Sequence, residues 1–463
     1  MNTNDKKGLS RRQFLKRLGL GAAVTTAALT GCAPKKEGGA SSLLHADSGE
    51  MTYRTTPTTG DKVSLLGYGC MRWPQENPDD RNSPLDQEAV NELVDYALAH
   101  GVNYFDTAPV YCRGTSERVT GNALKRHPRN TWYVATKLSN TRDFSKEAAL
   151  KMYRKSFEEL QVDYIDYYLL HSIGGGKGIE TVRERFFDNG VMDFLLEERK
   201  AGRIRNLGFS FHGDVKAFDY LLSLHDEIRW DFVQIQLNYV DWTHANEQNR
   251  RNVDADYLYA ELEKRGIPAV IMEPLLGGRL ASLGDHLSER LWSERPDQSI
   301  ASWAFRFAGT PKGVLTVLSG MTRQEHLEEN IATYSPLKPC TEGELKLLEE
   351  VAELYVRYPL IPCNNCQYCM PCPYGLDIPA TLLYYNKCIR EGSMLTTSAT
   401  ESYRRNRRAF LIGYDRAVPK VRQADHCIGC GECLEPCPQR IDIPKQMRII
   451  DAYVEQLKRG DDF

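Results

Sequence analysis

The chain has 463 residues, which is enough for two or three domains that each bury a hydrophobic core. Its composition, 41% hydrophobic and 26% charged, is ordinary for a soluble protein. The net charge is −3, and because residues 1–31 contribute +5 (six basic residues and one acid), the remainder carries −8, which argues against a nucleic-acid partner.

Residues 1–32 have the pattern of an export signal. Paired Arg11 and Arg12 in "SRRQFLK" precede an apolar stretch, Leu18 to Leu29, that is too short to span a bilayer. The run resembles the twin-arginine export signal, and "LTGC" resembles a bacterial lipobox with Cys32 as the lipidated residue. The resemblance implies a periplasmic lipoprotein held at the membrane by its N-terminal lipid, with residues 33–50 as a flexible tether.

Eight short apolar runs then alternate with segments that have helical spacing of apolar residues. The runs cover 63–71, 102–106, 131–138, 164–171, 204–210, 231–237, 267–273 and 313–319. Eight strands alternating with helices predict an α/β fold, a (β/α)₈ TIM barrel over residues 51–340. An open doubly wound sheet is the alternative, but no G-x-G-x-x-G motif follows the first run.

Four polar residues, Asp106, Tyr111, Lys137 and His171, lie at or just after the ends of predicted strands. In a (β/α)₈ barrel, the carboxyl ends of the strands build the active site. Each residue alone has an ordinary structural explanation, such as a surface lysine or a loop histidine. Together, in "FDTAPVY", "ATK" and "LLH", they resemble the catalytic tetrad of the aldo/keto reductases, and this resemblance covers about residues 51 to 336.

The resemblance implies the reduction of a carbonyl, or the reverse oxidation of an alcohol, with Tyr111 as the general acid. A tyrosine is a weak acid with an ordinary pKa near 10. A cationic Lys137 beside it is expected to lower that pKa. Asp106 would hold Lys137 in place, and His171 would orient the carbonyl oxygen of a small-molecule substrate.

The same resemblance implies a nicotinamide cofactor, with NADP or NAD left open. It places the carboxamide against Ser210 and Gln234. Two departures from the family pattern are Phe211, where an Asn commonly follows the serine, and Met272, where a tyrosine often stacks on the nicotinamide. The adenosine phosphate end would contact a second group in "LSGMTRQEHLEEN": Ser319, Gly320, Thr322, Arg323, Glu329 and Asn330.

Eight of the 13 cysteines fall in two tight runs near the C-terminus. The second run, "CIGCGECLEPCP", matches the C-x₂-C-x₂-C-x₃-C-P pattern of bacterial ferredoxins, and the first, "CNNCQYCMPCP", is one residue shorter in its last gap. Zinc is the alternative, although it usually takes cysteine pairs separated by a spacer. The runs predict two [4Fe–4S] clusters in a domain of residues 341–463, with these ligands: Cys363, Cys366, Cys369, Cys372, Cys427, Cys430, Cys433 and Cys437.

An internal repeat, "CPYGLDIPATLLYYN" and "CPQRIDIPKQMRIID", joins each run to a predicted helix, so the domain resembles an α-helical ferredoxin. In two-cluster ferredoxins the fourth cysteine of each run ligates the other cluster. The resemblance therefore pairs Cys437 with the first three cysteines of the first run, and Cys372 with those of the second. A capping box at Thr341–Glu344 begins the helix that joins the two domains.

The barrel and the cysteine-rich domain together resemble the ferredoxin-bearing branch of the aldo/keto reductases. The leading expectation is an exported oxidoreductase whose clusters exchange electrons with an external redox partner. The alternative is an electron-transfer or assembly protein whose barrel no longer acts as a nicotinamide-dependent reductase.

The export signal gives the first testable prediction. Replacing Arg11 and Arg12 together by Lys keeps the charge but should block export, because the twin-arginine route requires the arginine pair. Cys32→Ala should instead release a soluble, exported protein. Both outcomes are measured by fractionating cells into cytoplasm, membrane and periplasm, and unchanged fractionation of both variants would contradict the signal.

Overall fold

The computed structural model describes residues 49–78, 80, 82–249, 251–357, 360–391, 393–394 and 403–460. The twin-arginine run, Cys32 and nearly all of the proposed tether lie outside these residues. No helix in this described part of the chain combines the length and the apolar character that crossing a membrane would need.

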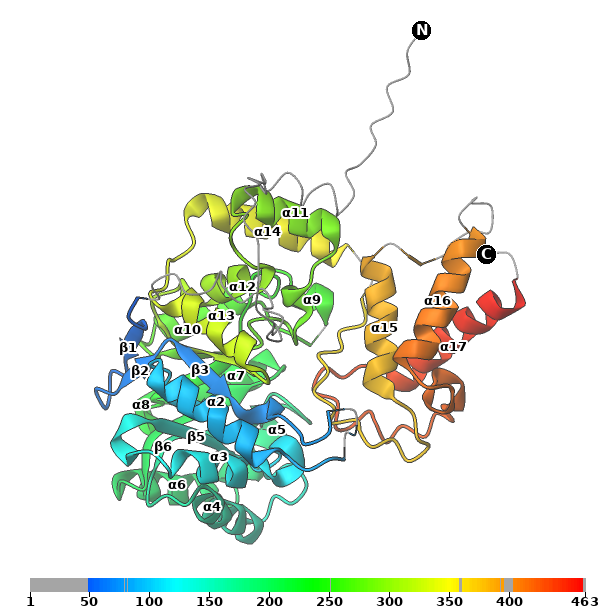
Figure 1. Cartoon of the computed structure of the whole chain (residues 1–463). Coiled ribbons are helices and arrows are strands. Elements are labelled where there is room, and N and C mark those ends of the chain that lie inside the picture. The colour runs from blue at the N-terminus through cyan, green and yellow to red at the C-terminus, as the bar shows by residue number, and fades with distance from the viewer. Residues whose placement is uncertain are drawn as a thin grey trace, which may run out of the picture. The chain divides into compact units, whose positions relative to one another are not determined.

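Eight parallel strands close into a barrel in the order β10-β3-β4-β5-β6-β7-β8-β9 (Figure 1). The predicted (β/α)₈ fold is confirmed, since each predicted run contributes one barrel strand. The barrel strands are β3 (Leu66–Gly69), β4 (Tyr104–Asp106), β5 (Tyr133–Leu138), β6 (Ile165–Ile173), β7 (Ile204–Phe211), β8 (Phe232–Gln236), β9 (Ala269–Met272) and β10 (Val314–Ser319).

A hairpin closes the amino-terminal end of the barrel. β1 (Tyr53–Thr55) and β2 (Lys62–Ser64) pair in antiparallel fashion, and Val63 packs into the cluster of side chains inside the barrel. The predicted run 63–71 is therefore divided between the hairpin and the first barrel strand. With one end filled by the hairpin, the carboxyl ends of the strands remain to form a site.

Amphipathic helices cover the outside of the barrel. In α2 the buried residues Val90, Leu93, Val94 and Ala97 follow helical spacing, and Asp86 caps the first turn by accepting a hydrogen bond from the Ala89 amide. The longer barrel helices are α2 (Gln87–Ala99), α3 (Ser116–Leu124), α4 (Lys146–Leu160), α6 (Val191–Lys200), α7 (Val215–Ser223), α10 (Ala255–Glu263), α11 (Asp285–Glu294), α12 (Ile300–Gly309) and α13 (Gln324–Tyr334). Shorter helical turns are α5 (Ile179–Val182), α8 (His225–Ile228) and α9 (Ala245–Gln248).

The C-terminal region is helical, as expected for an α-helical ferredoxin. It consists of α15 (Ile378–Arg390), α16 (Tyr403–Ala417) and α17 (Ile443–Arg459), which share a separate hydrophobic core (Figure 1). The sequence repeat is repeated in structure: Asp377 and Asp442 each cap a helix that has Pro in its first turn. We call residues 360–460 the cysteine module.

Helix α14 (Glu342–Val356) begins at the predicted capping box, in which Thr341 and Glu344 bond reciprocally. The predicted boundary after residue 340 assigned this helix to the C-terminal domain, whereas its buried residues Leu348, Val351 and Tyr355 belong to the core of the barrel. Its apolar stripe therefore covers the barrel, and the separate core of the cysteine module begins at Ile361.

Glu344 fixes α14 to the barrel and gives a stability prediction. Its carboxylate binds Arg306 at 2.8 and 2.9 Å and also Arg295, and it is 2% exposed. Burial alone would raise the pKa of Glu344, but the bonds from Arg306 and Thr341 outweigh it and lower the pKa to about 2. Glu344→Gln leaves Arg306 uncompensated and should cost about 3 kcal/mol of unfolding free energy.

The measurement is urea unfolding followed by tryptophan fluorescence, which reports on the barrel because all six Trp residues precede α13. Glu350→Gln, half exposed on the same helix, is the matched control. Because the folded pKa lies below the ordinary 4.5, the stabilisation is fully present above pH 4.5 and is lost as the pH falls toward 2. A Glu344→Gln variant as stable as the control at neutral pH would contradict this account.

Candidate functional site

A buried ion pair lies at the carboxyl end of β4 and β5. The Lys137 ammonium donates to Asp106 Oδ1 at 2.5 Å and to the Thr107 carbonyl at 2.8 Å. Lys137 is fully buried and Asp106 is 2% exposed. Burial lowers the pKa of Lys137 and raises that of Asp106, and the attraction between them opposes both shifts.

Tyr111 lies over this pair, at the start of a short 3₁₀ turn, Tyr111–Gly114. The Lys137 Nζ is 4.8 Å from the centre of the Tyr111 ring. The expectation that Lys137 lowers the pKa of Tyr111 is wrong for this arrangement. Burial, followed by the negative charge of Asp106, raises that pKa well above its ordinary value. Tyr111 is therefore a neutral phenol at physiological pH and can donate a proton.

His171, on β6, faces Tyr111 with 6.0 Å between the ring centres. Its Nδ1 lies 2.5 Å from the Ser139 hydroxyl, and Arg185 donates to its carbonyl oxygen at 2.8 Å. Burial and the nearby Lys137 charge lower the pKa of His171 well below its usual value. In the tautomer in which Ser139 donates to Nδ1, the neutral ring carries its proton on Nε2, which can donate to a carbonyl oxygen.

Three of the four tetrad residues line a cavity of about 1840 Å³: Asp106, Tyr111 and His171. Lys137 lies beneath it, fully buried. The structure thus brings the four residues together from β4, β5, β6 and the turn that follows β4, in the arrangement expected at the carboxyl ends of a barrel. Their roles in catalysis stay predictions.

The residues predicted to contact a nicotinamide nucleotide are distributed unevenly around this cavity. At the carboxamide end, Gln234 and Met272 line it, and Gln234 Oε1 is buried without a hydrogen-bond partner among the described residues. Ser210 lies behind, fully buried, and accepts from the Ser172 amide at 3.0 Å. The residues of the adenosine end that line the cavity are Ser319, Gly320, Thr322, Glu329 and Asn330.

Arg323 lies on the surface at the N-cap of α13 and is not a wall of the cavity, so a contact with a 2′-phosphate is not supported by its position. Ser319 and Asn330 bond each other at 3.0 Å, and Thr322 donates to the Arg72 carbonyl at 2.9 Å. The cavity therefore suits the carboxamide end of a nicotinamide through Gln234, whereas Arg323 is an exposed side chain outside its lining.

The sequence shows Phe211 where the family commonly has an asparagine, but it was not used to predict that His212 lines the cavity. Side chains alternate along a strand, so Ser210 and His212 share one side and Phe211 the other. Phe211 packs outward on Phe218, with 5.0 Å between the ring centres. His212 lines the cavity 6.0 Å from the His171 ring, and burial lowers its pKa to about 4. Alternation along the strand was the signal that could have revealed His212.

The first cysteine set surrounds a small cavity of its own, with walls that include Cys363, Cys366, Cys369 and Cys437. Cys437 comes from the second run, as the crossed pairing implies. Four thiols are the donor set that a [4Fe–4S] cluster requires, and this group fits the residues present. No group of three or more His, Cys, Asp or Glu in the described ranges is arranged to hold a single metal ion.

The second set is formed by Cys427, Cys430 and Cys433 with Cys372. Burial, together with the other three thiols of this set, raises the pKa of Cys433 to about 11. All four residues line the large cavity, and Cys430 is exposed. The two runs therefore exchange their fourth cysteine in space, which gives two complete four-thiol sets.

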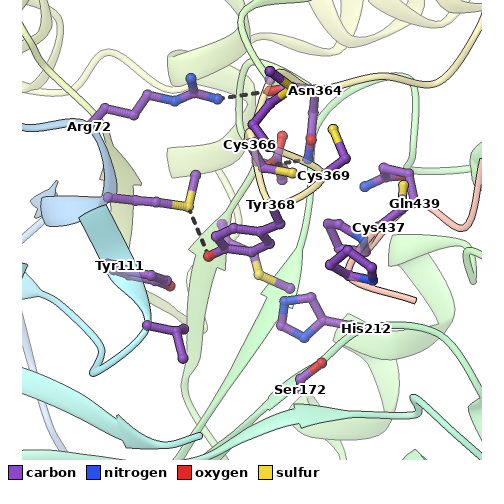
Figure 2. A pocket seen from close by; sticks show the side chains of 18 of the residues that line it. Arg72, Tyr111, Ser172, His212, Asn364, Cys366, Tyr368, Cys369, Cys437 and Gln439 are labelled. Carbon is purple, nitrogen blue, oxygen red and sulfur yellow. Dashed lines mark hydrogen bonds between the residues drawn. The ribbon is translucent and has the colours of Figure 1, made fainter. Parts of the chain in front are cut away.

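The cysteine module reaches the barrel through residues that the sequence did not single out. Cys366, Cys369 and Cys437 line the same large cavity as Tyr111 and His171, and Tyr368 projects between these groups (Figure 2). The sequence gave no signal for Tyr368, because its position depends on how the two domains pack.

Two sequence profiles match the chain. The profile of the aldo/keto reductase family matches residues 65–353. The chain belongs to the aldo/keto reductase family. A 4Fe-4S dicluster domain profile matches residues 362–442. The barrel match ends within α14, in agreement with the packing of that helix on the barrel.

Similar proteins cover the barrel rather than the whole chain. L-galactose dehydrogenase of Arabidopsis thaliana is 27% identical over 303 residues, which are 62% of this chain and 88% of that protein. NADH-specific methylglyoxal reductase of Escherichia coli is 23% identical over 343 residues, 65% of this chain and 98% of that protein.

Among solved structures, the holo form of aldo-keto reductase AKR11C1 from Bacillus halodurans aligns with a TM-score of 0.51 at 22% identity, covering 65% of this chain and 96% of that one. The thermostable aldo-keto reductase Tm1743, in complex with the inhibitor epalrestat, aligns with a TM-score of 0.52 at 22% identity, covering 65% and 100%. These likenesses support the barrel fold of this aldo/keto reductase family member.

The crossed cysteine sets give a spectroscopic prediction. Cys437→Ser replaces a soft thiolate by a hard oxygen, which iron–sulfur clusters hold poorly, and it should damage the cluster bound by Cys363. Cys363→Ser and Cys437→Ser should therefore give the same altered electron paramagnetic resonance spectrum of the dithionite-reduced protein, and Cys430→Ser a different one. If Cys437→Ser matches Cys430→Ser instead, each run closes its own cluster.

Proposed function

We propose that this aldo/keto reductase family member is an exported oxidoreductase that reduces a small carbonyl compound, or oxidises the corresponding alcohol, and that it exchanges electrons through two [4Fe–4S] clusters. One observation carries the proposal. A single cavity is lined both by Asp106, Tyr111 and His171 and by every cysteine of the two sets except Cys363.

The tetrad can perform the proton chemistry of such a reaction. A bound nicotinamide supplies a hydride to the carbonyl carbon, and a [4Fe–4S] cluster passes single electrons. Tyr111 holds the proton for the carbonyl oxygen, and its raised pKa keeps that proton in place until the oxygen becomes basic. Lys137, 4.8 Å from the ring centre, would then stabilise the phenolate that forms.

His171 would orient the substrate rather than transfer a proton. Its lowered pKa keeps the ring neutral, so it donates a hydrogen bond to the carbonyl oxygen without competing with Tyr111 as an acid. Ser139 and Arg185 hold the ring and its backbone in one orientation. The substrate oxygen would lie between two donors that differ in role.

An external redox partner would meet the second cysteine set. Cys430 is exposed, and its neighbour Ile428 is 63% exposed. Cys363 and Cys437 of the first set are buried. We infer that electrons pass between the partner and the first set by way of the second.

The proposed location rests on the sequence alone. Export by the twin-arginine route carries folded proteins, which suits a protein that acquires its clusters in the cytoplasm. Lipidation at Cys32 would then hold the mature protein at the periplasmic side of the membrane. The export signal and the cysteine runs support each other, since a protein that has acquired its clusters is already folded and needs a route that carries folded proteins.

A second candidate is an electron-transfer or assembly protein whose barrel does not use a nicotinamide. The surface position of Arg323 and the complete burial of Ser210 favour it. Quenching of NADPH fluorescence by the purified anaerobic protein distinguishes the two, since only the first requires a nucleotide in the cavity.

Tyr111→Phe tests the proposed reaction. Loss of the proton donor should lower the turnover of 4-nitrobenzaldehyde by about 10²- to 10⁴-fold, while circular dichroism stays unchanged. The assay uses the anaerobic holoprotein with NADPH and, separately, with dithionite. Tyr257→Phe, 40% exposed on α10, is the control. Turnover by Tyr111→Phe above a few per cent of wild type would refute the role of Tyr111.

A further inference from the structure

The cysteine module is clamped onto two loops of the barrel by the stretch that carries its first cysteines. Arg72 donates to the carbonyls of Asn364 at 2.8 Å and Asn365 at 3.1 Å. From the other side, Asn364 donates its side-chain amide to Glu273 at 2.9 Å. Arg72 therefore holds the backbone of residues 364–365, and Glu273 holds the Asn364 side chain, just ahead of Cys366.

A close backbone approach completes this clamp. A Cβ atom added to Gly277 would lie only 2.3 Å from the Cβ of Asn364 and 2.5 Å from its Cα. Gly277 has φ +70°, so any side chain there would also strain the backbone. The loop after β9 and the cysteine-bearing stretch are therefore in direct contact.

The clamp places Tyr368 in the mouth of the barrel. Its hydroxyl donates to the sulfur of Met71 at 3.5 Å, and it lines the cavity with Tyr111 and His212. Figure 2 shows the ring between Tyr111 on one side and the cysteines of the module on the other. The residue is part of the module by sequence but part of the barrel pocket by position.

We propose that Tyr368 forms the outer wall of the substrate pocket, where it positions the carbonyl compound against Tyr111 and limits its size. Because Tyr368 lies between Cys366 and Cys369, the loop that holds the first cluster also closes the pocket. The favoured substrates are therefore compact carbonyl compounds, and a protein without the first cluster has a loosened pocket. The preference for compact substrates rests on the proposed function, whereas the position of Tyr368 as a wall of the pocket does not.

Cys112 provides a test of the wall that needs no turnover. It follows Tyr111, is half-buried, and its thiol lies 3.3 Å from the Met71 carbonyl, on the residue that Tyr368 contacts. Its alkylation by iodoacetamide in the anaerobic holoprotein, followed by mass spectrometry of the Cys112 peptide, reports whether the Tyr368 ring shields this neighbouring thiol. Tyr368→Ala should speed this alkylation about tenfold.

The matched control is Tyr374→Ala, since Tyr374 also follows a cysteine by two residues but is 48% exposed. In this variant, iodoacetamide should alkylate Cys112 at the wild-type rate. Arg72→Ala, which releases the clamp from the barrel side, is the second variant if Tyr368→Ala fails to retain its clusters, and it should also speed the alkylation. If Cys112 is alkylated at the wild-type rate in both Tyr368→Ala and Arg72→Ala, the proposal that Tyr368 forms the pocket wall is wrong.

Substrate size is tested with two aldehydes, compact 4-nitrobenzaldehyde and three-ringed 9-anthraldehyde. Tyr368→Ala should shift the ratio of their kcat/KM values toward the larger aldehyde by about tenfold, and Tyr374→Ala should not. An unchanged ratio together with unchanged alkylation overturns the inference. If no variant reduces either aldehyde, the proposed function fails, and the alkylation rates still decide whether Tyr368 covers the pocket.

Discussion

The buried pair of Asp106 and Lys137 is the constraint on which the rest of the site depends. An ammonium group without solvent contact is costly, and it is stable here because Asp106 and the Thr107 carbonyl accept from it. Its fixed position places a positive charge under the face of Tyr111 and depresses the pKa of His171. One desolvated pair thus helps to set the protonation of the residues on both sides of the substrate position.

Much of the barrel could be predicted from sequence, because strand and helix periodicities are local properties. Lys137 and His171 were found since each stands near the carboxyl end of an apolar run. The direction in which the pKa of Tyr111 is shifted could not be predicted in this way. It depends on how much water the fold removes from around the ring, and that is a tertiary quantity.

The same distinction applies at the domain boundary. The capping box at Thr341 was local and correctly placed, but the side on which α14 packs was not encoded in its own spacing. His212 could have been predicted from alternation, whereas Tyr368 could not. Tyr368 belongs to the cysteine module by sequence but lines the barrel cavity, and this position follows only from contacts between the two parts, such as that of Arg72 with Asn364.

The exchange of Cys372 and Cys437 between the two sets has a consequence for how the protein is made. Synthesis proceeds from the N-terminus, so the second four-thiol set is complete only when residue 433 has left the ribosome, and the first only when residue 437 has. Chains truncated before residue 433 therefore carry only partial sets, even when their barrel is entire. Translation of both cysteine runs becomes a precondition for loading either cluster, which makes cluster content a measure of whether the second run has been made.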